Sequence, residues 1–276
     1  MSNNLKDILK KKLTKKELEL VPSSYDIVGN IIIFSDFPKQ LTKREKIIGT
    51  EILRNFNHIQ SVFKKTKKYS GKFRTPKLKL LAGKNDKEIE YKENNVRLKL
   101  NVEKVYFSPR LSEERKRISK KVKNNETILV MFSGCAAYPL VIAKNTGAKK
   151  IYAIEINPTA HKYALENIQL NKIKNIELIK GNVENVVPKL NKKFDRIIMP
   201  LPKEASDFLD LALKKTKKNG TIHLYSFTKE NEYEDIIKAI EKECKNQKKQ
   251  CKISSIVKCG QFSPRVFRIC VDIKVK

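Results

Sequence analysis

Two segments near the middle of the chain have the residue types and the spacing of a nucleoside-binding site. Ser133 and Gly134 follow an apolar run, where small residues let the backbone approach a ligand closely. Glu155 ends the next apolar run about twenty residues later, where doubly wound folds place an acid that accepts hydrogen bonds from ribose hydroxyls. An ordinary small-residue turn and a solvated helix cap are the alternatives, but the two features in register favour a ribose site.

The next two apolar runs also end in residues suited to contact a ligand. Asn182, between Gly181 and Val183, offers an amide side chain that fits the edge of an adenine. Pro200 and Pro202, in the segment Met-Pro-Leu-Pro-Lys, fix the backbone and remove two N–H donors, which leaves carbonyl groups to face a substrate. A simple strand stop is the alternative for the proline segment.

A charged cluster precedes these segments. Arg110, Glu114 and Arg117 fall within two turns of one face of a predicted helix, and Arg115 is adjacent to them. Arginines beside a carboxylate are typical of a surface ion pair, and taken alone the spacing favours that interpretation.

Elements that position these residues are readable from about residue 109 onward, where strand, glycine-containing turn and helix repeat. Buried strands that alternate with helices indicate an α/β fold with a doubly wound, mostly parallel sheet of seven strands, closed by an antiparallel edge. The predicted strands are 127–132, 151–156, 176–180, 196–199, 221–227, 253–258 and 267–273, and the predicted helices are 138–145, 160–171, 205–215 and 232–244.

The preceding part of the chain has a different pattern. Residues 1–22 are predicted to form one or two short basic helices that end near Pro22. Residues 23–108 are predicted to form a small α+β domain, and 109–276 the larger α/β domain. The small domain begins with a hairpin over 25–34 that turns at Gly29 and Asn30. Its other predicted elements are a helix over 44–56 and strands over 87–92 and 96–102.

The overall charge points to a polyanionic partner. The 276 residues include 60 Lys and Arg against 30 Asp and Glu, which gives a net charge of +30, while 40% of the residues are hydrophobic, as in a folded protein. Nucleic acid is the leading partner and an anionic membrane surface the second. The loop from Gly260 to Arg265 combines the aromatic Phe262 with the cation Arg265, so it either contacts RNA or simply connects two strands.

Several classes of protein and site are excluded or disfavoured. No apolar run is long enough to span a membrane, and the first residues lack the apolar core of a secretory signal. The five cysteines contain no CxxC pair and are odd in number, which favours free thiols in a reducing cytoplasm. The three histidines lie far apart and match no zinc spacing, so we expect no metal site.

The motifs together resemble a known family, the archaeal and eukaryal-type tRNA (guanine-37-N1) methyltransferases with their wybutosine-pathway relatives. The Tyr-Phe-Ser-Pro-Arg-Leu segment over 106–111 and the Ile-Glu-Ile-Asn-Pro segment over 154–158 are the most specific matches. The resemblance runs in order along the chain, through 24–29, 81–83, 105–111, 131–134, 151–158, 166–171 and 195–203.

This resemblance implies a class I methyltransferase fold with S-adenosylmethionine as cofactor. It also implies a monomeric enzyme whose partner is the anticodon stem-loop of tRNA, with the small α+β domain contacting the RNA. It gives Glu114 the role of general base at guanine N1 and Arg110 that of a positive group near the base. The cofactor residues it implies are Arg115, Phe132, Ser133, Gly134, Glu155, Ile156, Asn182, Val183 and Pro200, and the substrate residues, with Arg265 of the C-terminal loop, are Tyr106, Pro109, Leu201, Pro202 and Lys203.

The chain departs from the family pattern at three points. Val130 stands where relatives usually have Asp, Ala136 where they have a second glycine, and Pro200 where the base-holding loop commonly has Asn. The chain also begins too late for the N-terminal domain that inspects the tRNA elbow. Two alternatives therefore stay open. One is a wybutosine-pathway enzyme that transfers the aminocarboxypropyl group or methylates a tricyclic base, and the other is a non-catalytic RNA-binding relative.

Overall fold

The computed structural model describes residues 4–203, 205–263 and 265–276. The chain divides into two compact units. The N-terminal unit comprises the residues up to Lys92 together with Arg97–Pro109, and the C-terminal unit comprises Glu93–Val96 together with Arg110–Lys276. None of the helices in the described ranges has the length and apolarity that crossing a membrane requires.

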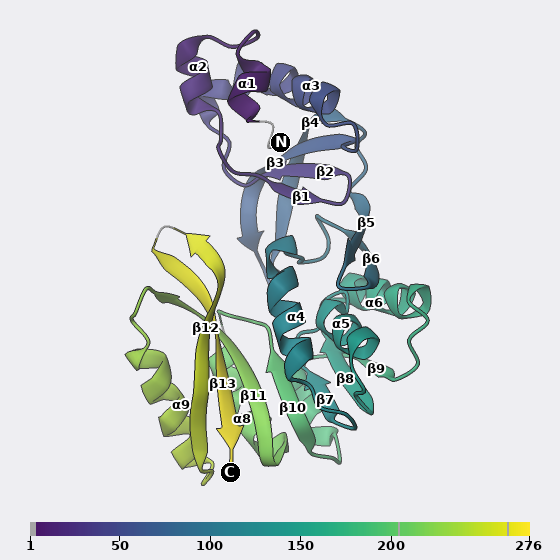
Figure 1. The fold of residues 1–276 in the computed structure, drawn as a ribbon, viewed down its shortest axis with the longest axis vertical. Helices are drawn as coiled ribbons and strands as arrows, with labels where there is room; N and C mark the ends of the chain where they lie inside the picture. Colours follow the sequence, from purple (N-terminus) through teal and green to yellow (C-terminus); the bar gives the residue numbers. More distant parts are fainter. Residues whose placement is uncertain (1–3, 204, 264) are drawn as a thin grey trace. The chain divides into compact units, whose positions relative to one another are not determined.

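The N-terminal unit contains a four-stranded sheet in the order β1-β2-β3-β4 (Figure 1). Strands β1 (Asp26–Val28) and β2 (Ile31–Phe34) form the predicted hairpin, whose turn contains Gly29 at a φ of 60°. The predicted helix is α3 (Glu45–Asn55), which connects β2 to its parallel neighbour β3 (Ser61–Ser70) by way of the short helix η1 (Lys39–Arg44). Strand β4 (Thr75–Gly83) runs antiparallel to β3. Strands β3 and β4 were not predicted from the sequence.

The first two helices pack into the core of this unit. Leu5 and Leu9 of α1 (Leu5–Leu9) are buried with Ile48 and Ile52 of α3 and with Phe34 of β2. Helix α2 (Lys15–Leu20) begins with a capping box in which Thr14 and Glu17 bond each other's backbone N–H groups. The predicted strands of the second hairpin are β5 (Glu88–Glu93) and β6 (Val96–Asn101).

The C-terminal unit is built on a seven-stranded sheet in the order β12-β13-β11-β10-β7-β8-β9. Strands β9, β8, β7, β10 and β11 are parallel, and β13 is antiparallel to both β11 and β12. The predicted doubly wound sheet with an antiparallel edge is therefore confirmed. The bounds are β7 (Thr127–Val130), β8 (Lys150–Glu155), β9 (Ile176–Lys180), β10 (Phe194–Met199), β11 (Thr216–Lys229), β12 (Cys251–Ser263) and β13 (Val266–Val275).

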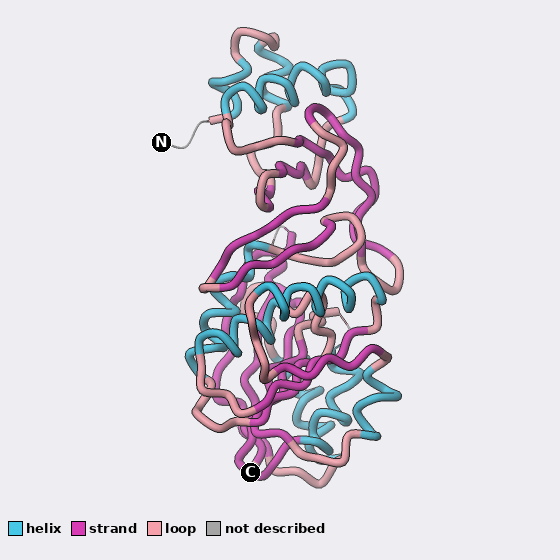
Figure 2. The backbone as a smooth tube through the Cα atoms, turned by 90° about the vertical axis from the view of Figure 1, so that its right-hand side faces the viewer, coloured by secondary structure: helices cyan, strands magenta, loops and turns pink. Residues whose placement is uncertain are grey.

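Helices cover both faces of this sheet (Figure 2). Alternate residues of β10 show the division, because Ile197 packs with α8 and α9 on one face and Ile198 packs with α4 and α5 on the other. The helices are α4 (Ser112–Lys121), which follows η2 (Pro109–Leu111), then α5 (Ala137–Asn145), α6 (Pro158–Leu170), α7 (Val183–Val186) with η3 (Val187–Lys189), α8 (Leu209–Lys215) after η4 (Ala205–Phe208), and α9 (Glu234–Asn246).

The cysteines correct one expectation. Cys244 in the last turns of α9 and Cys251 at the start of β12 form a disulfide across seven residues. The prediction that all the thiols are free is therefore wrong for this pair. Cys135, Cys259 and Cys270 are free and buried.

Gly49 allows α3 to approach β4 closely. A Cβ added at Gly49 would lie 2.7 Å from the Cβ of Ala82 and 3.0 Å from its backbone nitrogen. We therefore expect Gly49→Val to push the helix from the sheet and destabilise the N-terminal unit by about 1–3 kcal/mol, the usual effect of overpacking. Amide hydrogen exchange of α3 and β4 measures it.

Lys46→Val is the matched control, because it introduces the same side chain on the exposed face of α3. Equal hydrogen-exchange protection in the two variants would contradict the close-approach argument.

Candidate active site

The loop after β7 holds its backbone in an uncommon conformation. Phe132, Gly134 and Ala136 have φ angles of 58°, 59° and 67°, in the left-handed region. The N–H of Ser133 donates to the carbonyl of Ile154 in β8 over 2.9 Å, which ties the loop to the end of the neighbouring strand. The ring of Phe132 packs edge-on against Phe208 at a centroid distance of 5.2 Å. The loop is thus rigid at the carboxyl edge of the sheet, where ligands of such folds bind.

Glu155 is fixed by backbone donors at the end of β8. Its Oε2 accepts from the N–H of Gly134 at 2.6 Å, and its Oε1 accepts from the N–H of Asn157 at 2.7 Å. Burial raises the pKa of Glu155, and the backbone hydrogen bonds oppose that rise. The backbone N–H of Ile156 also bonds this carboxylate, which leaves one of its four lone-pair positions for a further donor such as a ribose hydroxyl.

Ser133 supplies the observation that tests whether a cofactor fits here. Its side chain is buried, and its hydroxyl oxygen finds no hydrogen-bond partner among the residues that the structure describes. Buried polar atoms are nearly always bonded, so an orphaned hydroxyl in this loop fits a polar ligand that supplies the partner. Together with Glu155, it suits the polar parts of a nucleoside cofactor.

The third strand end differs in detail from the expectation. Asn182 caps α7, since its Oδ1 accepts from the N–H of Glu184 at 3.2 Å and its Nδ2 donates to the carboxylate of Glu184 at 2.8 Å. The side chain of Val183 is buried in the sheet core. Ile156 lies directly after Glu155 and is half-buried.

The proline segment after β10 forms a tight turn. The N–H of Leu201 donates to the carbonyl of Met199 at 2.9 Å, and the carbonyl of Leu201 accepts from the N–H of Ala205 at 3.0 Å. The expectation that the segment leaves its carbonyls to a substrate is therefore wrong for Met199 and Leu201. Pro200, Pro202 and Lys203 are half-buried or exposed, while Leu201 also packs against the sheet core.

Arg115 is buried in an ion pair. Its guanidinium bonds the carboxylate of Glu93 through both Nε and Nη2, the latter at 2.6 Å. It also lies 5.9 Å from the ring centre of Tyr138. Burial raises the pKa of the nearby Cys135 thiol to about 12, although the charge of Arg115 opposes that rise.

Glu114 is buried on the face of α4 that meets the sheet. Arg117 bonds both of its oxygens, Nε to Oε2 at 2.7 Å and Nη2 to Oε1 at 2.8 Å, as their spacing on the helix predicts. The hydroxyl of Tyr225 in β11 donates to Oε1 at 2.6 Å. Burial raises the pKa of Tyr225 well above its ordinary value, so this hydroxyl stays protonated. The surface ion-pair interpretation is therefore wrong, because Glu114 is only 5% exposed. Arg110 in η2 is exposed.

A chain of alternating charges continues from Arg117 across the sheet. Arg117 reaches Asp272 of β13 at 3.0 Å, and Asp272 accepts from Nδ1 of His223 in β11 at 2.6 Å. Nε2 of His223 lies 2.6 Å from Nη1 of Arg196 in β10, which also pairs with Glu126 at 2.7 Å. Sequence reasoning missed His223 and Asp272, although a charged or titratable residue inside an apolar strand is a usable signal.

The partners of His223 assign its protonation. Arginine only donates, so Nε2 must accept and the single ring proton lies on Nδ1, which donates to Asp272. Burial lowers the pKa of His223 and the charge of Arg196 lowers it further, while Asp272 opposes the shift. Burial would raise the pKa of Asp272, but the hydrogen bonds from His223 and Arg117 bring it well below its ordinary range. Cys270 joins His223 and Asp272 in a buried group of possible metal ligands, but these groups already bond one another and two arginines. Nε2 of His223 meets Arg196, and the carboxylate of Asp272 accepts from Arg117, His223 and the thiol of Cys270.

A cavity of about 420 Å³ lies at the edge of the sheet opposite to the carboxyl ends of the parallel strands. It lies where β7, β10 and β11 begin and is lined by cations and anions together, among them Lys121, Lys274 and Asp195. Arg196 and His223 also line it, so the charge chain ends there.

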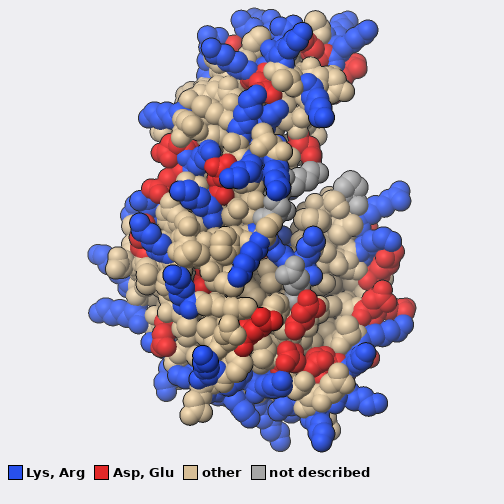
Figure 3. All heavy atoms as spheres, turned by 180° about the vertical axis from the view of Figure 1, so that it is seen from behind, with Lys and Arg blue, Asp and Glu red and all other residues tan. Residues whose placement is uncertain are grey.

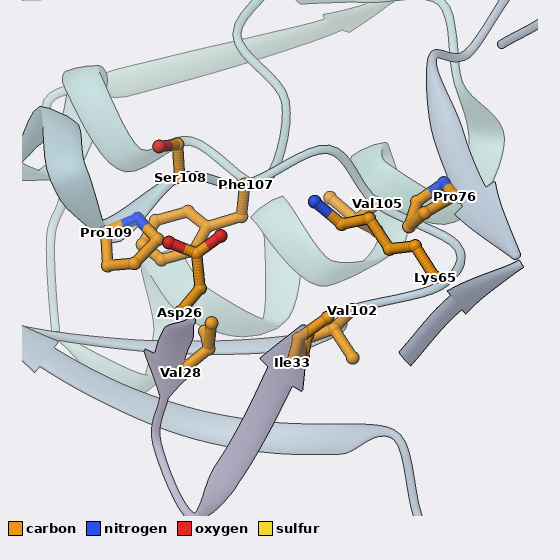
Figure 4. Close-up of a pocket in the computed structure, with 10 residues that line it drawn as sticks. All are labelled: Asp26, Val28, Ile33, Lys65, Pro76, Val102, Val105, Phe107, Ser108 and Pro109. Carbon is orange, nitrogen blue, oxygen red and sulfur yellow. The ribbon is translucent and has the colours of Figure 1, made fainter. Parts of the chain in front are cut away.

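The segment 106–109 belongs to the N-terminal unit. Pro109 lines a cavity of about 30 Å³, room for about one water molecule, with Asp26 and Phe107 on one side and Lys65 on the other (Figure 4). Tyr106 is half-buried in the same unit. This cavity is too small for a nucleotide.

The strand order, the antiparallel strand β13 between β11 and β12, and the anchored acid at the end of β8 define an α/β methyltransferase domain. A family model described as the TRM5/TYW2 methyltransferase domain matches residues 89–254, and one described as the TYW2 N-terminal domain matches residues 5–87. The chain belongs to the TRM5/TYW2 methyltransferase family.

Relatives match along nearly the whole chain. The sequence is 37% identical over 274 residues to the tRNA (guanine(37)-N(1))-methyltransferase Trm5b of Methanocaldococcus jannaschii, which covers 99% of this chain and 77% of that protein. It is 36% identical to the tRNA (guanine(37)-N(1))/4-demethylwyosine(37)-methyltransferase Taw22 of Nanoarchaeum equitans, over 91% of this chain and 99% of that one. The solved complex of aTrm5 and tRNALeu superposes with a TM-score of 0.87 at 34% identity, covering 100% of this chain and 79% of that chain.

The buried neutral His223 makes stability depend on pH. Its pKa is lower in the folded state than the ordinary 6.5, so the unfolded chain binds a proton that the folded one does not. We expect the free energy of unfolding to fall as the pH drops below about 6.5, by at most about 1.4 kcal/mol per pH unit. Denaturant unfolding followed by circular dichroism between pH 5 and 8 measures the slope.

His223→Asn should flatten this dependence, whereas His58→Asn, at an exposed position, should leave it unchanged. An unchanged slope in His223→Asn would show that another group causes the dependence.

Glu155 should dominate affinity for the nucleoside cofactor. Glu155→Ala removes the acceptor for the ribose hydroxyls, and hydrogen bonds to a charged group contribute about 1.5–3 kcal/mol. We expect titration with S-adenosylhomocysteine to show binding weakened about 10- to 100-fold. Glu177→Ala, an exposed glutamate on the adjacent β9, should bind as the unchanged protein does. Equal affinities in the two variants would remove Glu155 from the site.

Proposed function

We propose that this protein transfers the methyl group of S-adenosylmethionine to N1 of guanine 37 in tRNA, beside the anticodon. The observation that carries the proposal is the carboxyl edge of the sheet, where the anchored carboxylate of Glu155 and the orphaned hydroxyl of Ser133 lie in one loop cluster. Family membership supplies the reaction class. Arg115, Phe132, Ile156, Asn182, Val183 and Pro200 complete the proposed cofactor site.

Glu114 is the proposed general base. Guanine N1 carries a proton at neutral pH, and that proton must leave before N1 becomes a nucleophile. Arg117 and Tyr225 donate three hydrogen bonds to the Glu114 carboxylate, and the thiol of Cys259 is a further, weak donor, so the substrate proton would take the place of that thiol. The thiol of Cys259 is next to this carboxylate, and burial followed by the charge of Glu114 raises the pKa of that thiol.

The proposed chemistry needs one electrophile and one positive group. When bound, S-adenosylmethionine supplies a methyl group attached to a sulfonium, which an adjacent nucleophile displaces. The exposed guanidinium of Arg110 stabilises the negative charge that spreads to guanine O6 once the proton has left. Because N1 lies on the pairing edge, the base must be unstacked, and Tyr106, Pro109, Leu201, Pro202, Lys203 and Arg265 are the proposed contacts.

Lysines are the proposed source of affinity for the RNA backbone. Lys and Arg side chains are spread widely over the face drawn in Figure 3. In the N-terminal unit, Lys64 and Lys79 of β3 and β4 pair with Glu45, while Lys67 and Lys77 of the same strands are exposed. Such cations bind phosphates without reading sequence. We further propose that the enzyme acts as a monomer in the cytoplasm.

Methylation of the tricyclic 4-demethylwyosine at the same position is the second candidate. The match to Taw22 covers 99% of that protein at 36% identity, and the name of that enzyme includes both bases. Pro200 stands where the base-holding loop of relatives commonly has Asn, so this loop lacks one amide that could hydrogen-bond the base. Both candidates transfer the same group, so they differ only in the base accepted.

A two-label experiment tests the proposal. Two RNAs, a tRNA transcript with guanine at position 37 and a tRNA that carries 4-demethylwyosine there, are each incubated with S-adenosylmethionine labelled either in the methyl group or in the carboxyl group. Transfer of the methyl label alone to the guanine transcript supports the proposal, transfer of the methyl label only to the 4-demethylwyosine tRNA assigns the second candidate, and transfer of the carboxyl label assigns the aminocarboxypropyl reaction. Neither label in either RNA would leave a non-catalytic relative. A transcript with adenine at position 37 is the control.

Glu114→Gln tests the base. A glutamine cannot take up the N1 proton, so the single-turnover rate should fall about 10²- to 10⁴-fold, with affinity for S-adenosylhomocysteine unchanged. Glu113→Gln, at the exposed neighbouring position, should keep the rate. A rate in Glu114→Gln equal to that of the unchanged protein would reject the assignment.

A further inference from the structure

Two aromatic rings form an exposed shelf beyond the sheet of the C-terminal unit. Phe227 of β11 and Phe262 of β12 stack with their ring centres 4.1 Å apart and their planes at 32°. Phe262 is 56% exposed, the highest exposure among the large hydrophobic side chains that the structure describes. The strands that carry the rings continue past the rest of the sheet, because Met199, the last residue of β10, is opposite Leu224, whereas β11 runs on to Lys229 (Figure 1).

Cations lie beside this shelf. The guanidinium of Arg268 lies 5.4 Å from the ring centre of Phe227, and Nζ of Lys258 lies 5.0 Å from that of Phe267. Gly260 is opposite Arg268 in the strand register, and a Cβ at Gly260 would meet no atom within 4 Å, so the surface is open there. Proteins that bind single-stranded nucleic acids typically combine exposed aromatic rings, on which bases stack, with nearby cationic side chains.

The shelf adjoins Glu114, the proposed general base. Phe227 follows Tyr225 by two residues on β11, so the two side chains share a face about 7 Å apart along the strand. The hydroxyl of Tyr225 bonds Glu114. In the register, Tyr225 is opposite Cys270 and Phe227 is opposite Arg268, so Arg268 and Phe227 form the next row on the face that holds Glu114. When a nucleobase gives its proton to Glu114, the nucleotide next to it in the RNA would lie within reach of Arg268 and Phe227.

We propose that Phe262, stacked on Phe227, is the platform for an unpaired nucleobase adjacent to the methylated one. This inference rests on the proposed function. Stacking needs only a π face, so the platform adds affinity without selecting the base. Arg268, beside the ring of Phe227, and the exposed Arg265, just before β13, would neutralise the phosphates of that nucleotide. Lys258 pairs with Glu230, so the charge of the shelf comes from Arg268 and Arg265. With the net charge of +30 over the chain, they favour RNA over an apolar protein partner.

The test uses an anticodon stem-loop RNA with 2-aminopurine at position 36 or 38, next to guanine 37, and no cofactor. Stacking on the shelf should quench the fluorescence of at least one of the two probes on binding. Phe262→Leu keeps an apolar side chain but loses the π face, and it should abolish the quenching and weaken RNA binding about 5- to 150-fold. Phe262→Tyr should retain both properties.

Leu165→Ala is the control for loss of an exposed apolar side chain, since Leu165 on α6 is 48% exposed. Unchanged RNA affinity and quenching in Phe262→Leu would overturn the proposal, and so would equal losses in Phe262→Leu and Leu165→Ala. Because binding is read without methyl transfer, a chain that fails the two-label experiment can still pass or fail this one.

Discussion

The position of Glu114, the proposed general base, depends on one buried carboxylate, that of Asp272. Asp272 is 1% exposed and accepts a hydrogen bond from Arg117, which in turn donates to both carboxylate oxygens of Glu114. Lys121 and Ser255 also bond it, at 3.2 and 2.8 Å. Removing one partner from a buried pair costs about 3–5 kcal/mol, because the remaining charge is left without compensation. This network ties α4 to β11 and β13, so the helix that carries Glu114 has one position on the sheet.

The departures from the family pattern have physical readings. Ala136 has a φ of 67°, in the region that glycine adopts freely and that costs other residues about 1–2 kcal/mol. A glycine at this position would adopt the same φ without strain. In this chain the hydrogen bond from the loop to β8 holds the strained conformation of Ala136 in place. Val130 is fully buried among Ile128 and Ile198, so an apolar residue suits its surroundings. Neither change removes Glu155 or Ser133.

Much of the fold was predictable from the sequence, and less of the site. The parallel strands are apolar runs between helices, so their positions along the chain followed directly, and the spacing of Ser133 and Glu155 indicated their shared edge. Strands β3 and β4 were missed because lysines interrupt their apolar residues. The i,i+3 pair of Glu114 and Arg117 is local, but Asp272 lies 155 residues after Arg117, and only the folded sheet brings them together. The Cys244–Cys251 disulfide was missed for another reason, since spacing alone does not reveal geometry.

The central claim is that an acid held by this network prepares guanine N1 for a methyl group. Mass spectrometry of nucleosides tests it most directly, after tRNA has been incubated with the protein and S-adenosylmethionine that carries a deuterated methyl group. The account predicts deuterated N1-methylguanosine at position 37. The label on another atom or another nucleoside, or its absence from the RNA, would contradict the account.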